Sequence, residues 1–258
     1  MDQKTETLDV TGFYDRLSDD YDVMTGFDQR FVRERPFIKL LVDRYRIGRA
    51  VDAGTGTGFH ALLLARLGVH VTAIDLAPAM IAALTRHAAQ EELEIAAVVG
   101  AFDQLPDLVS ERQDAVLSMG NTLAHMPTSE HLQEALGSFR RILRPGGILL
   151  IQMLNYRRIL TLRESVLADK VVHGVRFLRW YAYEGDRIRF NITREVVDGS
   201  MPGETRSIEL SPFLDSDLRQ AIRSAGFETP QLYGSIALEA YDEERSKDLV
   251  ILARAPGA

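Results

Sequence analysis

A glycine-rich turn between a strand-like run and a helix-like run constrains the fold of this chain more than any other feature. Residues 52–58 read DAGTGTG, follow the apolar run 50–53 and precede the amphipathic segment 58–67. Glycine lacks a Cβ atom, so such a turn bends tightly and lets a ligand touch the backbone. Ligands of doubly wound α/β sheets bind where a strand ends and a helix begins. We therefore interpret the turn as a binding site rather than as a purely structural turn.

Strand-like and helix-like segments alternate through the middle of the chain. A strand, a helix and a second strand in series imply right-handed crossovers and a parallel sheet. The pattern predicts an α/β fold with a Rossmann-like, doubly wound and mostly parallel sheet. Strand-like runs cover residues 50–53, 69–74, 95–99, 115–119 and 148–153, and amphipathic runs cover 58–67, 78–89 and 129–143.

The flanks of this core have different patterns, but no repeat or flexible linker separates them from it, so we expect a single domain over 1–258. Its parts are a helical cap over 1–45, a binding core over 46–155, an inserted lid or substrate region over 156–213 and a C-terminal completion of the main sheet over 214–258. Within these parts we expect an antiparallel sheet from the runs 171–183, 187–197 and 205–213, with turns at 184–186 and 198–199, then a helix over 215–225 and a strand over 247–254.

Composition and charge limit the partners of the chain. With 37 acidic against 30 basic residues the net charge is −7, which argues against nucleic acid, because phosphate binding needs clustered Lys and Arg. There is no cysteine, which excludes disulfides and thiolate chemistry, and the six histidines are scattered, so we expect no metal site. No apolar run approaches the roughly 18 residues of a membrane span. We expect a cytoplasmic protein without membrane contact and leave a homo-oligomer open.

An acidic residue follows the second strand-like run. Asp75 ends the run 71–74, where its carboxylate is placed to accept both hydroxyl protons of a ribose. Alternatively, it caps the helix that begins near Pro78. Because the acid occurs together with the glycine turn, the sequence favours a nucleoside ligand.

The ordered motifs of the core resemble those of class I S-adenosylmethionine-dependent methyltransferases. They are the turn 52–58, Asp75, the segment GAFD at 100–103 followed by Leu105-Pro106, and LRPGG at 143–147. The resemblance spans about residues 51–153 and implies that S-adenosylmethionine is the cofactor. By the same resemblance the cofactor contacts are Tyr14, Asp52, Gly54, Gly56, Gly58, Asp75, Leu76, Met80, Phe102, Asp103, Met119 and Gly120. For Asp103 a surface acid that caps a short helix is the alternative.

The segment 118–125, SMGNTLAH, resembles glycine and sarcosine N-methyltransferases, in which a Gly-Asn pair and a His four residues after the Asn recur. The chain departs from that pattern at Leu123, usually aromatic, and at Arg157-Arg158, where an acid is expected. The similarity implies a small-molecule acceptor and slightly favours an amine nitrogen of amino acid or amino sugar type. It implies catalytic roles for His125, Asn121 and Tyr21, and substrate contacts at Asn155 and Tyr156. Side chains of the inserted sheet are further candidates to clamp an anionic substrate, because guanidinium groups match carboxylates; they are Arg176, Arg179 and Arg189, with Tyr181 and Tyr183.

Several alternatives stay open from the sequence. His125 is either a general base or a histidine that packs beside the pocket, and the arginines of the inserted sheet either clamp an anion or lie on solvated strand faces. An O-methyltransferase is the main alternative function. An NAD(P)-dependent oxidoreductase fits the loose pattern from Gly56 to Ala61, although no Tyr-x-x-x-Lys pair occurs, and a non-enzymatic S-adenosylmethionine sensor is a further alternative.

Overall fold

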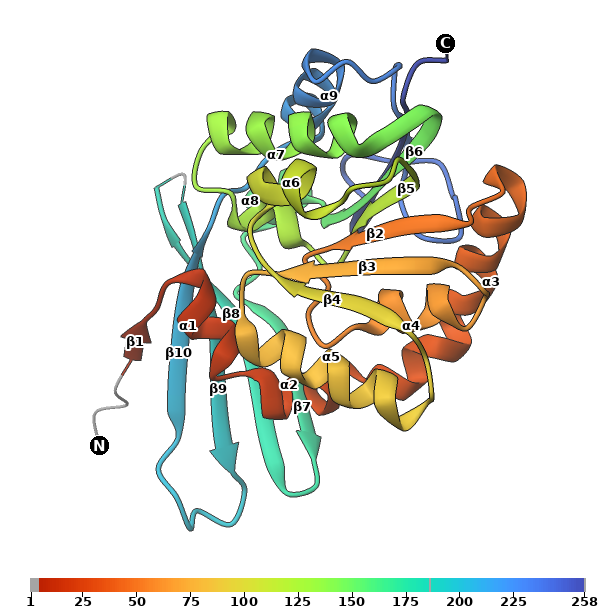
Figure 1. Cartoon of the computed structure of the whole chain (residues 1–258). Coiled ribbons are helices and arrows are strands. Elements are labelled where there is room, and N and C mark those ends of the chain that lie inside the picture. The colour runs from red at the N-terminus through yellow and green to blue at the C-terminus, as the bar shows by residue number, and fades with distance from the viewer. Residues whose placement is uncertain (1–4, 186, 258) are drawn as a thin grey trace.

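The computed structural model describes residues 5–185 and 187–257, apart from the side chains of Thr5 and Asp28. Its main sheet has seven strands in the order β11-β12-β6-β5-β2-β3-β4, and the five strands from β6 to β4 run parallel (Figure 1). The two C-terminal strands add antiparallel to β6. The strands are β2 (Arg49–Ala53), β3 (His70–Asp75), β4 (Ile95–Val99), β5 (Gln113–Ser118), β6 (Leu143–Leu154), β11 (Gln231–Tyr233) and β12 (Asp248–Arg254).

Helices cover both faces of this sheet because its central strands are apolar on both sides. On β6, Ile148 and Leu150 belong to one buried cluster and Leu149 and Ile151 to the other. Such near-continuous apolar runs are typical of parallel strands buried on both faces. One face carries α3 (Phe27–Tyr45), α4 (Phe59–Ala65) and α5 (Pro78–Gln90), and the other carries α7 (Ser129–Ile142), α9 (Asp215–Ser224) and the short α6 (Leu105–Leu108).

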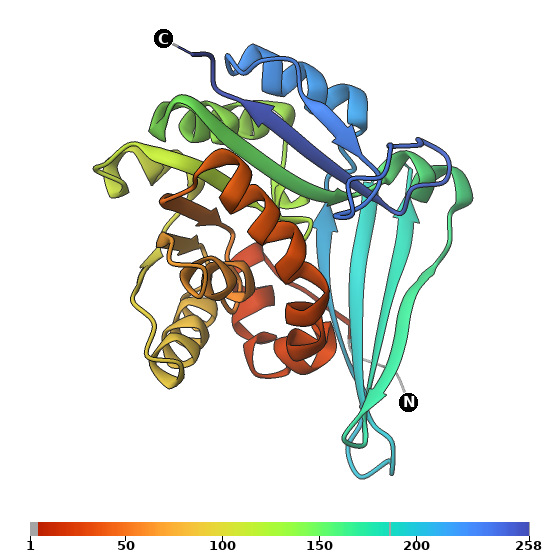
Figure 2. The ribbon, with the colours of Figure 1, turned by 90° about the vertical axis from the view of Figure 1, so that its right-hand side faces the viewer.

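A second, five-stranded sheet stands beside the main sheet (Figure 2). Its strand order is β1-β10-β9-β8-β7, and β7 to β10 pair antiparallel. The helix α8 (Tyr156–Leu162) leads into it from β6. Its strands are β1 (Thr5–Thr7), β7 (Val166–Val172), β8 (Val175–Glu184), β9 (Arg187–Val196) and β10 (Glu204–Leu210).

Two N-terminal helices, α1 (Val10–Asp15) and α2 (Ser18–Thr25), pack against one face of the second sheet. Phe13 of α1 lies in the same buried cluster as Phe177 of β8. An ion pair of 2.9 Å joins Arg194 Nε on β9 to Asp20 on α2. The helices therefore lie where the two sheets meet.

The expected fold class is confirmed, but one strand assignment was wrong. The run 171–183 is not one strand: it holds the end of β7, a tight turn in which His173 has φ 49° and Gly174 has φ 78°, and most of β8, which pairs antiparallel with β7. A histidine in the left-handed region gives no sequence signal, so the alternation was read as continuous. The sequence also gave no sign of β1, β11 and α8. In the expected turn 184–186, Asp186 lies outside the described residues, as do residues 1–4 and 258 at the ends of the expected domain.

None of the helices in the described part of the chain is long and apolar enough to cross a membrane.

The packing of the glycine turn against α5 predicts the effect of two substitutions. Gly58 has φ +94°, and a Cβ atom there would lie 2.0 Å from Cδ1 of the buried Leu84. We expect Gly58→Ala to lower the free energy of unfolding by roughly 2–4 kcal/mol, because backbone strain and overpacking add. Gly68→Ala, at φ +81° with no atom within 4 Å, is the matched control and should cost only about 1–2 kcal/mol. Equal losses for the two variants in urea unfolding would contradict this account.

Candidate active site

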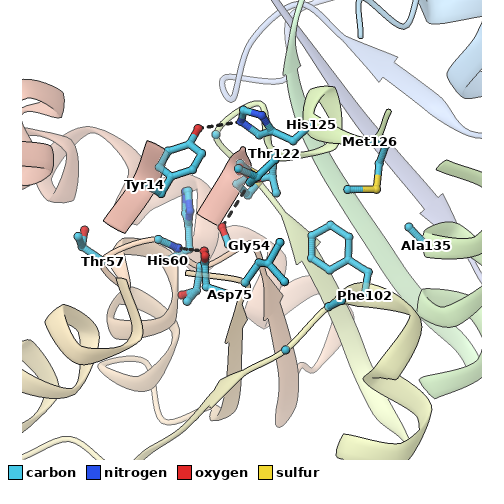
Figure 3. A pocket seen from close by; sticks show the side chains of 18 of the residues that line it. Tyr14, Gly54, Thr57, His60, Asp75, Phe102, Thr122, His125, Met126 and Ala135 are labelled. Carbon is cyan, nitrogen blue, oxygen red and sulfur yellow. Dashed lines mark hydrogen bonds between the residues drawn. The ribbon is translucent and has the colours of Figure 1, made fainter. Parts of the chain in front are cut away.

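A cavity of about 430 Å³ opens where β2, β3 and β5 end, beneath the N-terminal helices (Figure 3). This size is ordinary for a site that holds a cofactor or a drug-sized ligand. Its wall combines the glycine turn, the ends of two strands, both N-terminal tyrosines and one face of α7. The predicted site residues that line it are Tyr14, Tyr21, Gly54, Gly56, Asp75, Leu76, Phe102, Asp103, Met119, Gly120 and His125.

The glycine turn forms the floor of the cavity. Gly54 N and Thr55 N both donate to Ile74 O, at 2.8 and 3.0 Å, which ties the turn to β3. Gly54 has φ +77°, and a Cβ atom there would lie 2.2 Å from Cγ2 of Thr122. Only glycine fits such a close approach in the left-handed region.

The carboxylate of Asp75 lies at the end of β3 and faces this turn. Its Oδ2 accepts a hydrogen bond of 2.8 Å from Gly56 N, and its Oδ1 accepts one of 3.0 Å from Ala77 N. Burial raises the pKa of Asp75, and the two backbone hydrogen bonds act in the opposite direction. Each carboxylate oxygen has a second lone pair, so the group can still accept from a ligand.

Tyr14 and Tyr21 cover the cavity from α1 and α2. The Tyr14 hydroxyl lies 2.8 Å from Nε2 of His125, and the two rings meet edge to face. The Tyr21 ring lies close to Gly56: a Cβ atom added to this glycine would be 3.7 Å from the ring. Burial raises the pKa of both phenols, and it lowers the pKa of His125 to about 4. At neutral pH all three side chains are therefore uncharged.

Carboxylates of the N-terminal helices fasten this cover to the binding loops. Asp15 Oδ1 accepts a hydrogen bond of 2.9 Å from Ala79 N at the start of α5. Asp22 Oδ1 accepts one of 2.5 Å from the Thr57 hydroxyl in the glycine turn. The cover and the turn thus form one hydrogen-bonded unit.

Sequence reasoning missed Arg30, which lines the cavity from α3. Its Nε donates to Glu34 Oε1 at 2.8 Å, and His60 Nε2 lies 3.0 Å from the other oxygen of Glu34. Burial alone would raise the pKa of Glu34, but these hydrogen bonds outweigh it and hold the pKa well below its ordinary value. Glu34 lies one turn along α3 from Arg30, a spacing that the sequence shows, whereas His60 comes from the packing of α3 against α4.

The opposite wall was predicted only in part. Phe102 and Asp103 line it as expected, with the exposed Leu76 on the same rim. Residues of α7 complete this wall, together with Met126 and Thr122; those of α7 are His131, Glu134 and Ala135. Residues three and four positions apart lie on the same face of a helix. The sequence therefore shows this spacing, but the amphipathic pattern alone did not indicate that this face lines a cavity.

Three expected cofactor residues lie behind the cavity wall rather than in it. Asp52 is buried and accepts a hydrogen bond of 2.7 Å from the Thr55 hydroxyl. Gly58 meets Leu84, as described above, and Met80 is fully buried in α5. Each supports the turn or the adjacent helix, so any effect on a ligand is indirect.

Asn121, which follows β5, forms a hydrogen-bonded pair with Tyr156. Asn121 Nδ2 donates to the Tyr156 hydroxyl at 2.8 Å, and Asn121 Oδ1 accepts from Leu154 N at 3.1 Å. Next to them, Gly120 N donates to Gln152 Oε1 at 2.8 Å. These contacts hold Gly120 in the cavity wall, while the side chain of Asn121 faces β6.

The remaining expected substrate residues do not line the cavity. Asn155 is buried and donates to the carbonyl oxygens of Glu243 and Ser246, so it holds the C-terminal loop. Arg176 pairs with Asp169 at 2.8 Å on the second sheet. Tyr181 is buried in the core of that sheet.

The described residues contain no group of three or more His, Asp or Glu side chains placed to hold a metal ion.

Comparison with known proteins agrees with the fold and the motifs. Residues 50–147 match a family model described as a methyltransferase domain. A glycine/sarcosine N-methyltransferase of Aphanothece halophytica is 24% identical over 243 residues, 91% of this chain and 85% of that protein. The CcbJ methyltransferase of Streptomyces caelestis superposes with a TM-score of 0.80 at 21% identity, over 97% of this chain and 100% of that one. CalS10 of Micromonospora echinaspora, an amino pentose methyltransferase solved with S-adenosylmethionine, superposes with a TM-score of 0.63 at 19% identity, over 86% and 91%.

The fold, the glycine turn and the family match together define a methyltransferase domain. The chain is a class I S-adenosylmethionine-dependent methyltransferase, and S-adenosylmethionine is its cofactor. This assignment sets aside the NAD(P)-dependent oxidoreductase and the non-enzymatic sensor. The residues that line the cavity fit this cofactor. The buried carboxylate of Asp75 suits the ribose hydroxyls, the guanidinium of Arg30 suits the carboxylate of the methionyl part, and the ring of Phe102 suits the adenine.

The burial of His125 predicts a dependence of stability on pH. Its pKa falls from 6.5 to about 4, so between these values the unfolded chain binds a proton that the folded chain does not. Neutral His125 therefore contributes its full share of the free energy of unfolding above pH 6.5. This contribution, roughly 3 kcal/mol, is lost as the pH falls towards 4. His125→Gln should remove that part of the pH dependence in urea unfolding. The exposed His70→Gln is the control, and equal pH dependence in both variants would contradict the account.

Proposed function

We propose that this methyltransferase acts on the amine nitrogen of a small molecule of amino acid or amino sugar type. Two of the related proteins described above have names that point to amine-bearing acceptors, glycine/sarcosine in one and an amino pentose in the other. The cavity, with a volume of about 430 Å³ and with Tyr14 and Tyr21 in its wall, suits a small molecule, and the net charge of −7 disfavours nucleic acid.

Side chains of the cavity have complementary roles towards the cofactor in this proposal. Asp75 accepts hydrogen bonds from the ribose hydroxyls, and Phe102 packs against the adenine, with Asp103 at its edge. Arg30 pairs with the carboxylate of the methionyl part, next to Gly54 and Gly56. The support for these roles is that all of these groups line the same cavity.

The single observation that carries the choice of an amine is that no side chain at the covered end of the cavity is a base with a pKa near neutrality. Tyr14, Tyr21 and His125 are all neutral there at neutral pH, and His125, with a pKa of about 4, is a weak base. A hydroxyl acceptor must lose its proton, which needs a base with a pKa near the working pH. A neutral amine brings its own lone pair. Such a site therefore favours an amine that enters uncharged.

The chain's own residues contribute mainly orientation and exclusion of water. Bound S-adenosylmethionine supplies a sulfonium-activated methyl group for an in-line displacement. The Tyr14 hydroxyl and His125 Nε2, 2.8 Å apart, form a fixed dipolar pair that can accept the N–H of an aligned amine. Tyr21 and the helix that carries it close the cavity over the glycine turn, which keeps water away during transfer. The proton of the methylated amine leaves to solvent after transfer.

O-methylation remains the second candidate, since the cofactor half of such a site is the same for both acceptors. The Tyr14–His125 contact is the feature that would serve it, if Tyr14 passed a proton to His125. The low pKa of His125 makes that proton transfer unfavourable.

The acceptor class is testable by transfer of labelled methyl groups from S-adenosylmethionine to matched amines and alcohols. We expect methylation of amines only, with a rate that follows deprotonation of the amine and shifts along the pH axis with the pKa of the amine offered. Methylation of the alcohols, with a pH profile independent of the acceptor, would instead support O-methylation. Denatured enzyme is the control for spontaneous transfer.

The role of Asp75 is testable by binding alone. We expect Asp75→Ala to weaken binding of S-adenosylhomocysteine roughly 30- to 300-fold in calorimetry, because hydrogen bonds to a charged acceptor contribute about 1.5–3 kcal/mol each. Asp107→Ala, an exposed carboxylate on α6, is the matched control and should bind like the parent. A folded Asp75→Ala variant with the affinity of the parent would contradict the assigned role.

A further inference from the structure

One arginine of the second sheet differs from all others there, because no residue that the structure describes is its ion-pair or hydrogen-bond partner. Arg179 makes no hydrogen bond and no ion pair with any described residue. The other arginines in the strands of this sheet are each ion-paired to a carboxylate; they are Arg176, Arg187, Arg189, Arg194 and Arg206. The sheet thus neutralises every guanidinium except one.

Arg179 lies on the face of the sheet that is directed towards the N-terminal helices. Successive side chains of β8 point to opposite faces of the sheet. Arg179 shares its face with Phe177 and Tyr181, which lie two residues before and after it and are both buried. Its cross-strand neighbour on β9 is the buried Ile192. The side chain is itself half-buried, so it is not a solvated strand-face arginine.

The titratable groups that interact with this guanidinium are phenols. Arg179 interacts electrostatically with Tyr21 and Tyr181, and burial lowers its pKa. Tyr21 is part of the cavity wall and contacts the glycine turn at Gly56. Arg179 does not itself line the cavity, and its interaction with Tyr21 is what connects it to the covered end of the cavity.

A half-buried cation without a counter-ion costs stability, because desolvation is not compensated. Such unfavourable groups are retained where a ligand supplies the partner. The flat fork of a guanidinium matches a carboxylate, with two parallel hydrogen bonds. A single cation among neutral phenols also suits a singly charged group better than a phosphate dianion.

We propose that Arg179 is the specificity-determining residue of the acceptor site and pairs with a carboxylate of the methyl acceptor. The inference rests on the proposed function and narrows it to amines that also carry a carboxylate. The acceptor reaches the guanidinium beside the ring of Tyr21, with its amine towards Tyr14 and His125. An amino sugar without an acidic group lacks the partner that Arg179 requires.

The test measures binding first, so that it does not depend on knowing the acceptor. Acetate and its uncharged analogue acetamide are titrated by NMR into the complex of the full chain with S-adenosylhomocysteine. We expect acetate to bind, acetamide to bind at least tenfold more weakly, and Arg179→Met to lose the preference. Arg187→Met removes an exposed, paired arginine of the same sheet and should keep the preference of the parent. Arg179→Lys keeps the charge without the fork and should fall between parent and Arg179→Met.

Turnover provides the second measurement. Amino acids and their carboxamides are compared as methyl acceptors, and Arg179→Met should raise KM for the acids at least tenfold with a smaller change in kcat. Because Arg179 has no ion-pair or hydrogen-bond partner among the described residues, Arg179→Met should have a Tm equal to or above that of the parent. Unfolding of this variant would contradict the unpartnered state on which the inference depends.

The outcomes separate this inference from the proposed function. If acetate and acetamide bind alike, if no acetate binding is seen in the parent, or if Arg179→Met keeps the preference, Arg179 is not the acceptor anchor. If amines without a carboxylate are methylated as well as the acids, the inference fails while amine methylation stands. If only alcohols accept the methyl group, the proposed function itself fails.

Discussion

The site depends on one hydrogen bond, from Gly56 N to the Asp75 carboxylate, which joins the turn after β2 to the end of β3. It can form only because the turn follows a tight left-handed path that glycine permits. Parallel pairing of β2 with β3 places both chain segments at the same edge of the sheet. A backbone donor and a buried carboxylate thus meet where an anionic and hydroxyl-bearing ligand is to be held.

The N-terminal helices cover this edge of the sheet and so form the cavity. Their carboxylates, Asp15 and Asp22, bind backbone and hydroxyl donors on α5 and on the glycine turn, while their tyrosines face inward. The second sheet supports the helices from behind and is bound to them through Asp20 and Arg194. Burial beneath this cover keeps the side chains of Tyr14 and His125 neutral.

Sequence reasoning predicted the core well because its signals are local. The apolar strands, the glycine turn and the acid at 75 each show within about seven residues, and most of the predicted cofactor residues line the cavity. The substrate residues were predicted poorly, because their places depend on long-range packing. Asn155 and Arg176 look like ligands in the sequence, yet each is occupied by internal partners. Arg30 was missed, and Arg179 was only one of several arginines of the inserted sheet that the sequence offered as an anion clamp. Only the assembled fold shows which arginine faces the cavity and which has no carboxylate partner among the described residues.

The central claim is that the cofactor lies along the turn and Asp75, with its methyl group directed to the covered end of the cavity. The most direct test is an NMR measurement of nuclear Overhauser contacts from the ¹³C-labelled methyl group of bound S-adenosylmethionine. The account predicts contacts to the rings of Tyr14, Tyr21 and His125. Contacts to Phe102 and Met126 on the opposite wall, without any to the tyrosines, would contradict it.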